Sequence, residues 1–114
     1  MKKLFILNFL FFFFNTFSFS QNTKLDSLRL LLKTDKPDTN KLFHLNKLSR
    51  GYNGIGSYDS AVFFANAALQ LSNEILKETK DQKINQTTKK YEAAAFNNIG
   101  NVNSNKGNYT EALK

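Results

Sequence analysis

A short pattern occurs twice in the chain: GSYDSA at residues 56–61 returns as GNYTEA at residues 107–112. Leu48 and Ile99 stand eight residues before the two glycines, so the match extends into the preceding segments. Glycine favours the left-handed turn at a helix end, and a small alanine lets two helices approach closely. The pattern therefore predicts a repeated helical hairpin, because these residue types serve helix packing.

Leucine spacing predicts two helices on either side of Pro37. The first covers about residues 24–33, where leucines recur at helical spacing. It ends before the proline, because the residue preceding a proline disfavours the helical conformation. Asp38 or Thr39 is expected to cap the second helix. One face of that second helix carries four large apolar residues: Leu42, Leu45, Leu48 and Tyr52.

A longer helix is expected to begin at Tyr58, with Ser57 as its cap. Apolar or small residues recur in it at three- and four-residue spacing as far as residue 76. Ala61 is expected at the close contact with the preceding helix. The chain then turns polar over residues 77–90, and we expect a turn near residues 85–88.

A third long helix is expected from about residue 89 to Gly107, where the glycine would end it. Asn108 would cap a last short segment, with Glu111 at the spacing of a capping box. Without the second helix of that hairpin, three apolar residues of the third long helix would lie uncovered: Tyr91, Ile99 and Val102.

The first twenty residues have the three-part layout of a secretory signal peptide. Two lysines follow the initiator methionine, an apolar run spans residues 4–14, and small residues occupy Ser18 and Ser20. We expect cleavage before Gln21 and export across the inner membrane into the periplasm. The alternative is an uncleaved membrane anchor, although the apolar run is shorter than the roughly 20 residues that a span requires.

Composition limits the kinds of partner. The chain has 114 residues, no cysteine and a formal net charge of +7. Beyond the signal peptide its lysines are scattered among acidic residues, and the one close cluster there is Lys89–Lys90. No basic stripe is visible, so we expect no nucleic-acid binding. Membrane contact is expected only through the signal peptide or a segment beyond Lys114.

No residue pattern suggests chemistry. His44 is the only histidine, and it stands in a predicted helix without a second metal ligand or catalytic partner nearby in the sequence. Gly51, Gly54 and Gly56 follow a helix instead of a strand, so they do not resemble a phosphate-binding loop. We expect no catalytic, cofactor or metal site, and we do not expect an enzyme.

The repeated motif resembles the tetratricopeptide repeat (TPR), a helix-turn-helix unit of about 34 residues. The two copies stand 51 residues apart. They carry the signature as Leu45, Leu48-Ser49, Tyr52, Gly56, Tyr58, Ala61 and Ala68-Leu69, and as Phe96, Ile99-Gly100, Gly107, Tyr109 and Ala112. The resemblance implies an all-α, TPR-like α-solenoid that is incomplete at the C-terminus. It divides the mature chain into a leading helix and linker (residues 21–38), a first hairpin (about 39–84) and a truncated second hairpin (about 86–114).

The resemblance also implies a binding surface. In tetratricopeptide arrays the first helix of each hairpin lines a concave groove that holds a protein or peptide. Six polar residues would face that groove here: Asn46, Arg50, Asn53, Asn97, Asn101 and Ser104. The alternative is that these side chains are simply solvated, because exposed polar faces are the default for an amphipathic helix.

The whole layout is similar to the exported N-terminal region of repeat-bearing sensor proteins of Bacteroidetes-type bacteria. That likeness implies a non-catalytic protein-interaction module, the sensory or scaffold part of a longer signalling protein. The alternative is that the chain is the N-terminal fragment of an enzyme, such as a sensor histidine kinase or a cyclase.

Overall fold

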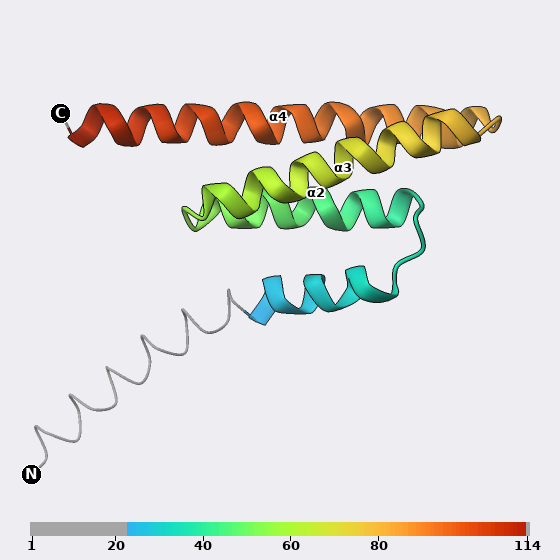
Figure 1. The fold of residues 1–114 in the computed structure, drawn as a ribbon, viewed down its shortest axis with the longest axis horizontal. Helices are drawn as coiled ribbons and strands as arrows, with labels where there is room; N and C mark the ends of the chain where they lie inside the picture. Colours follow the sequence, from blue (N-terminus) through green and yellow to red (C-terminus); the bar gives the residue numbers. More distant parts are fainter. Residues whose placement is uncertain (1–22, 114) are drawn as a thin grey trace, which may run out of the picture.

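The computed structural model describes residues 23–113, which are helical apart from three short connections (Figure 1). A leading helix includes residues 23–34. It is followed by α2 (Thr39–Gly54), α3 (Tyr58–Glu78) and α4 (Gln82–Leu113). No strand occurs in this part of the chain, so the all-α prediction is confirmed. The predicted signal peptide lies outside the described residues.

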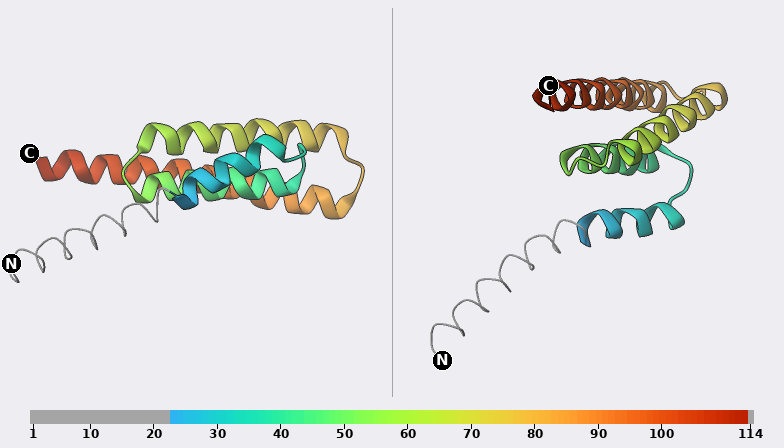
Figure 2. Two further views of the ribbon diagram at one scale, coloured as in Figure 1. Left: turned by 90° about the horizontal axis from the view of Figure 1, so that it is seen from below. Right: turned by 60° about the vertical axis from the view of Figure 1, so that its left-hand side comes forward.

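The helices follow one another as antiparallel neighbours. α2 and α3 form a hairpin, and α4 returns alongside it in the direction of α2 (Figure 1). The leading helix lies on the other side of α2 from α4, and the three views agree on this order (Figure 2). α2 and α4 are therefore parallel neighbours, and α3 packs against both of them.

The start of α2 follows the predicted chemistry. The side chain of Asp38 accepts hydrogen bonds from the backbone N–H groups of Asn40 (3.0 Å) and Lys41 (3.3 Å). A carboxylate there satisfies donors that have no partner within the helix. The break at Pro37 and the cap at Asp38 are thus confirmed.

The connection between α2 and α3 depends on Gly56, whose φ of 81° lies in the left-handed region that glycine adopts without strain. Ser57 occupies the residue before α3, but its hydroxyl makes no capping hydrogen bond. Ala61 is fully buried, and its carbonyl oxygen accepts a 2.6 Å hydrogen bond from the Ser49 hydroxyl. The predicted close contact between the two helices at Ala61 is confirmed.

The core lies where α2, α3 and α4 meet, and the leading helix extends it. The predicted leucine face of α2 is buried as expected. Tyr52 of α2 stacks on Phe64 of α3, with ring centroids 5.5 Å apart and planes 7° from parallel. The buried cluster consists of Leu25, Leu42, Leu45, Leu48, Phe64, Ala68, Leu71 and Ala95.

The turn between α3 and α4 lies at residues 79–81, so the turn predicted near residues 85–88 is wrong. The deciding residue is Asp81, whose carboxylate accepts hydrogen bonds from the backbone N–H groups of Lys83 (2.8 Å) and Ile84 (3.1 Å). This arrangement starts α4 with an aspartate cap. An aspartate within the polar run was the available signal, although neither glycine nor proline marks the place.

α4 also differs from the prediction at its other end, because it continues through Gly107 to Leu113 without a break. A Cβ atom at Gly107 would meet nothing within 4 Å, so no packing contact forces the chain to turn there. Glycine inside a helix costs only about 1 kcal/mol relative to alanine, whereas starting a new helix requires an unfavourable first turn. Continuing α4 through Gly107 is therefore favoured over ending it and starting a second helix.

The inward stripe of α4 is better covered than the sequence indicates. Val102 is fully buried, which corrects the expectation that it lies open, while Tyr91 and Ile99 are half-buried. Leu45 and Phe96 occupy matching motif positions, yet they are 4% and 59% exposed. Leu45 belongs to the buried cluster that includes Leu71 of α3, whereas Phe96 is not part of that cluster.

Candidate interaction face

The six residues predicted to line a groove fall into two groups. Asn46 is 2% exposed and lies between α2 and α4, so the prediction that it faces an open groove is wrong. Asn53 is half-buried at the same contact. The other four side chains are exposed: Arg50, Asn97, Asn101 and Ser104.

The Asn46 side chain makes three hydrogen bonds, and two of them join α2 to α4. Its Nδ2 donates to the carbonyl oxygens of Leu42 (3.2 Å) and Tyr91 (3.1 Å), and its Oδ1 accepts from Nδ2 of Asn98 (3.0 Å). Asn98 is 7% exposed. Burying an amide stabilises a structure only when its donors and acceptors find partners, as they do here. The pair therefore favours one particular alignment of the two helices.

A second asparagine pair repeats this contact seven residues further along both helices. Nδ2 of Asn105 donates to Oδ1 of Asn53 at 3.0 Å. Both pairs join residues 52 positions apart in the sequence, one more than the 51 positions that separate the matching motifs. The spacing of seven suits parallel helices, whose contacting residues recur at three- and four-residue steps. The buried pair of Asn46 and Asn98 fixes the register of α4 on α2, and the exposed pair has the same register.

The position of Arg50 follows from the contacts around α2. Ser49 contacts α3, whereas Asn46 and Asn53 contact α4. Successive residues of a helix are rotated by about 100°. Arg50 therefore lies beyond the α4 contact, on the side of α2 away from α3.

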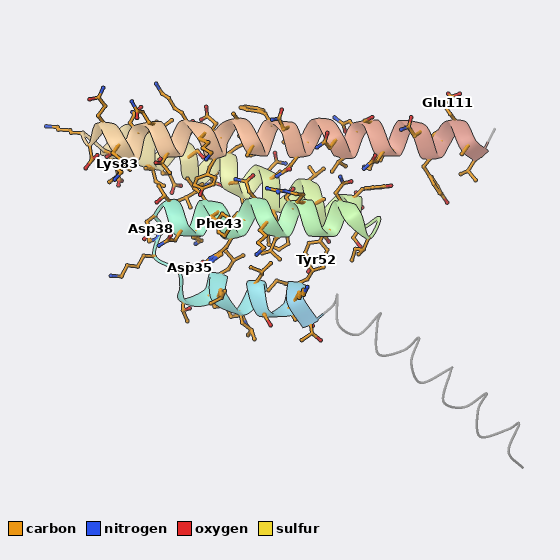
Figure 3. All side chains as sticks on the ribbon, turned by 180° about the vertical axis from the view of Figure 1, so that it is seen from behind. Asp35, Asp38, Phe43, Tyr52, Lys83 and Glu111 are labelled. Atoms are coloured by element: carbon orange, nitrogen blue, oxygen red, sulfur yellow. The ribbon has the colours of Figure 1, made fainter. Side chains whose placement is uncertain are left out.

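The same reasoning places the exposed residues of α4. Lys106 contacts Asp59 of α3 (3.7 Å), and Asn98 and Asn105 contact α2. Asn97 and Asn101 then lie beyond the α2 contact, also away from α3. We call this common side of α2 and α4 the open face, and Figure 3 looks towards it, with α3 behind α2.

Aromatic and basic side chains enlarge the open face. Phe43 of α2 meets Tyr91 of α4 edge-on, with ring centroids 6.2 Å apart, and remains 45% exposed. The ammonium group of Lys47 lies 5.7 Å from the centre of the Phe43 ring. With Arg50 nearby, this part of α2 presents two positive charges beside an aromatic ring, a combination that suits an acidic or amphipathic segment.

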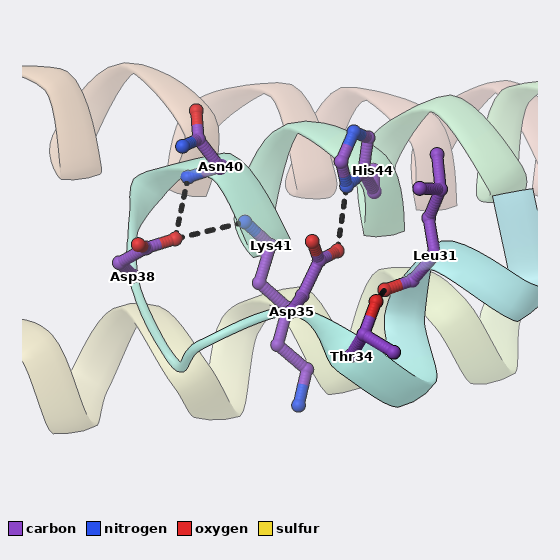
Figure 4. A network of polar contacts seen from close by, with 7 residues as sticks. All are labelled: Leu31, Thr34, Asp35, Asp38, Asn40, Lys41 and His44. Atoms are coloured by element: carbon purple, nitrogen blue, oxygen red, sulfur yellow. Dashed lines mark hydrogen bonds and ion pairs between the residues drawn. The ribbon is translucent and has the colours of Figure 1, made fainter.

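The linker before α2 is held in place by a polar contact. Nδ1 of His44 and Oδ2 of Asp35 lie 2.6 Å apart, and both side chains are largely buried (Figure 4). The Thr34 hydroxyl donates to the carbonyl oxygen of Leu31, at the end of the leading helix (3.2 Å). His44 thus joins the linker to α2, which gives the only histidine of the sequence a structural role.

Residues 23–113 contain no group of three or more His, Cys, Asp or Glu side chains that could hold a metal ion. Over the same residues, no helix has both the length and the apolar character needed to cross a membrane. Comparison with protein-family models, with curated proteins and with solved structures finds no match.

Sequence reasoning missed the asparagines that matter most for packing. Asn98 and Asn105 stand one residue after Asn97 and after Ser104, which were expected to line the groove, and their side chains bond to α2. Asn98 is buried, whereas Asn105 is exposed. A signal was present, because Asn46 and Asn53 have the same seven-residue spacing as Asn98 and Asn105. Phe43 and Lys47 gave no comparable signal, since a single aromatic and a single lysine are common on any helix.

Proposed function

We propose that the chain is a non-catalytic protein-interaction module built of TPR-like helical hairpins. The observation that carries the proposal is the parallel placement of α2 and α4, with exposed residues of both helices on the side away from α3. Two parallel helices in fixed register form a rigid platform, and rigid platforms suit recognition of an extended or helical segment.

The chemistry of the open face indicates the kind of segment. Arg50 and Lys47 supply positive charge, Phe43 supplies an aromatic surface, and Asn97 and Asn101 supply amide donors and acceptors. A protein segment with carboxylates flanking an apolar residue would match these groups. Charged partners of this kind add specificity, whereas buried aromatic contacts supply most of the affinity.

The proposed setting is the periplasm, in the sensory or scaffold part of a longer signalling protein. It rests on the signal-peptide layout of residues 1–20 and on the resemblance described above. The intact mass of the exported protein tests the export prediction. We expect the mass of a chain that begins at Gln21. Coding sequence for a membrane helix and a catalytic module beyond Lys114 would favour the enzyme alternative.

Site-specific photocrosslinking tests the binding face in the cell that makes the protein. A photoreactive amino acid replaces Arg50 in one variant, Asn101 in a second and Asn73, an exposed residue of α3, in a third. We expect the first two variants to capture the same protein and the third to capture none of it. Equal capture from all three positions, or none from the open face, would contradict the proposal.

A further inference from the structure

An open groove runs between the start of the leading helix and the end of α2. Two adjoining hollows make it, with volumes of about 330 and 420 Å³, and both are lined by Lys24, Leu28 and Lys47. The first hollow continues over Leu25, Gly51, Gly54 and Ile55. The second continues over Thr23 and Ser27. One end of the groove is therefore apolar, and the other carries hydroxyl groups.

Glycines give the apolar end its depth. A Cβ atom at Gly51 would stand 2.5 Å from Cδ2 of Leu25, so the glycine lets the leading helix approach α2 closely. A Cβ atom at Gly54 would meet nothing within 4 Å, so space remains above this part of α2. Ile55 is 43% exposed beside that space. An apolar surface of this kind gains free energy when a hydrocarbon group covers it.

The charged side chains that line the groove are all positive. Lys24 and Lys47 are both exposed at its rim, and none of the lining residues is acidic. Lysine side chains can lay their hydrocarbon stems along an apolar surface while the ammonium group stays in water. A ligand with an apolar body and an anionic end would satisfy both parts of the groove.

We infer that the groove binds a single-chain anionic amphiphile, specifically a free fatty acid of medium length. The chain would lie over Leu25, Gly54 and Ile55, and the carboxylate would lie between Lys24 and Lys47. A peptide fits less well along the apolar part of the groove, because Leu28 and Gly51 lie within helices and their backbone groups are bonded there. The amide groups of a peptide would lose water there without gaining partners, whereas a hydrocarbon chain needs none.

The test titrates decanoate, below its micelle concentration, into the isotopically labelled full chain in the form that the cell produces. We expect saturable, one-to-one shifts of the backbone resonances of Gly51, Gly54 and Ile55. Each methylene added to the acid should tighten binding by up to about fourfold, as long as the added methylene contacts apolar surface of the groove. Lys24→Gln and Lys47→Gln should each weaken binding by about two- to fivefold, as expected for exposed ion pairs.

A matched pair of glycine variants distinguishes decanoate binding in the groove from non-specific hydrophobic binding elsewhere on the protein. Gly54→Met places a side chain in the groove, whereas Gly100→Met places the same side chain on open surface of α4. Both remove a glycine from a helix, so neither should impair folding. Decanoate binding should be lost in the first variant and kept in the second.

Four results would overturn the inference. Decanoate could give no saturable shift in the full chain. Gly54→Met could bind as well as the unaltered chain, or decyltrimethylammonium could bind as tightly as decanoate, which would show that charge plays no part. Stronger shifts of the same resonances with N-acetyl-leucyl-leucine at equal concentration would assign the groove to peptide carboxyl ends instead.

Discussion

The buried asparagine pair between α2 and α4 gives the sharpest prediction of stability. In Asn46→Leu, Nδ2 of Asn98 loses its acceptor at 3.0 Å and retains only the Asn46 backbone oxygen at 3.4 Å. Losing the bond costs about 1 kcal/mol, and leaving a buried amide poorly paired adds about 1–3 kcal/mol. Burial of the leucine offsets part of this, so we expect a net loss of about 2–3 kcal/mol.

The double variant should behave differently. Asn98→Leu alone leaves Oδ1 of Asn46 without its donor and should cost about 1–2 kcal/mol. With both asparagines replaced, neither amide is left unpaired and two leucines of similar volume occupy the contact. Such a replacement is often nearly neutral. The coupling energy of the two changes should therefore reach about 3 kcal/mol.

Asn53 and Asn105 provide the control, because they form the same amide contact at the same 3.0 Å distance. Asn105 is exposed, so water can replace its lost partner. The two single leucine replacements and the double replacement at Asn53 and Asn105 should give a coupling energy below about 0.5 kcal/mol. The contrast isolates the effect of burial from that of the hydrogen bond.

Urea unfolding followed by the helical circular-dichroism signal measures all seven proteins. For a chain of this size, Asn46→Leu should lower the midpoint by about 1–2 M. Additive losses in the double variant, or equal coupling energies for the two pairs, would refute the reasoning. Either result would mean that the buried pair does not hold the two helices in register.

Three further predictions concern the helices themselves. Ala61→Leu should overpack the α2–α3 contact and lower the free energy of unfolding by about 1–3 kcal/mol in the same urea assay; an unchanged midpoint would exclude close packing at this residue. Gly100→Ala should raise stability by about 0.5–1 kcal/mol, whereas Gly51→Ala should lose that gain because its Cβ would press on Leu25; equal melting temperatures would contradict this. Asp81→Ala should cost about 1 kcal/mol and fray the start of α4, measured by amide exchange of its first turn; unchanged exchange would show that the carboxylate does not cap the helix.

Local chemistry explains what could be read from the sequence. The leucine spacing of α2, the break at Pro37, the cap at Asp38 and the buried Ala61 all depend on neighbours within one or two helical turns. Such patterns are visible without knowledge of the fold. The helical class followed for the same reason.

The features that were misjudged depend on contacts between distant segments. The sequence match aligns Asn46 with Asn97, but the helices pack with Asn46 against Asn98. A shift of one residue turns a helix by about 100°, which is enough to exchange an inward residue for an outward one. Gly107 was misjudged for a related reason, because only packing decides whether a glycine ends a helix or lies within it.

The proposed interaction platform depends on α2 and α4 lying parallel, with Asn46 against Asn98. Nuclear Overhauser contacts of the labelled full chain measure this arrangement without any substitution. We expect the side-chain amide protons of Asn98 to show contacts with Asn46, and those of Asn105 with Asn53. Contacts from Asn97 to Asn46, or none between the two helices, would contradict the parallel register and remove the basis of the open face.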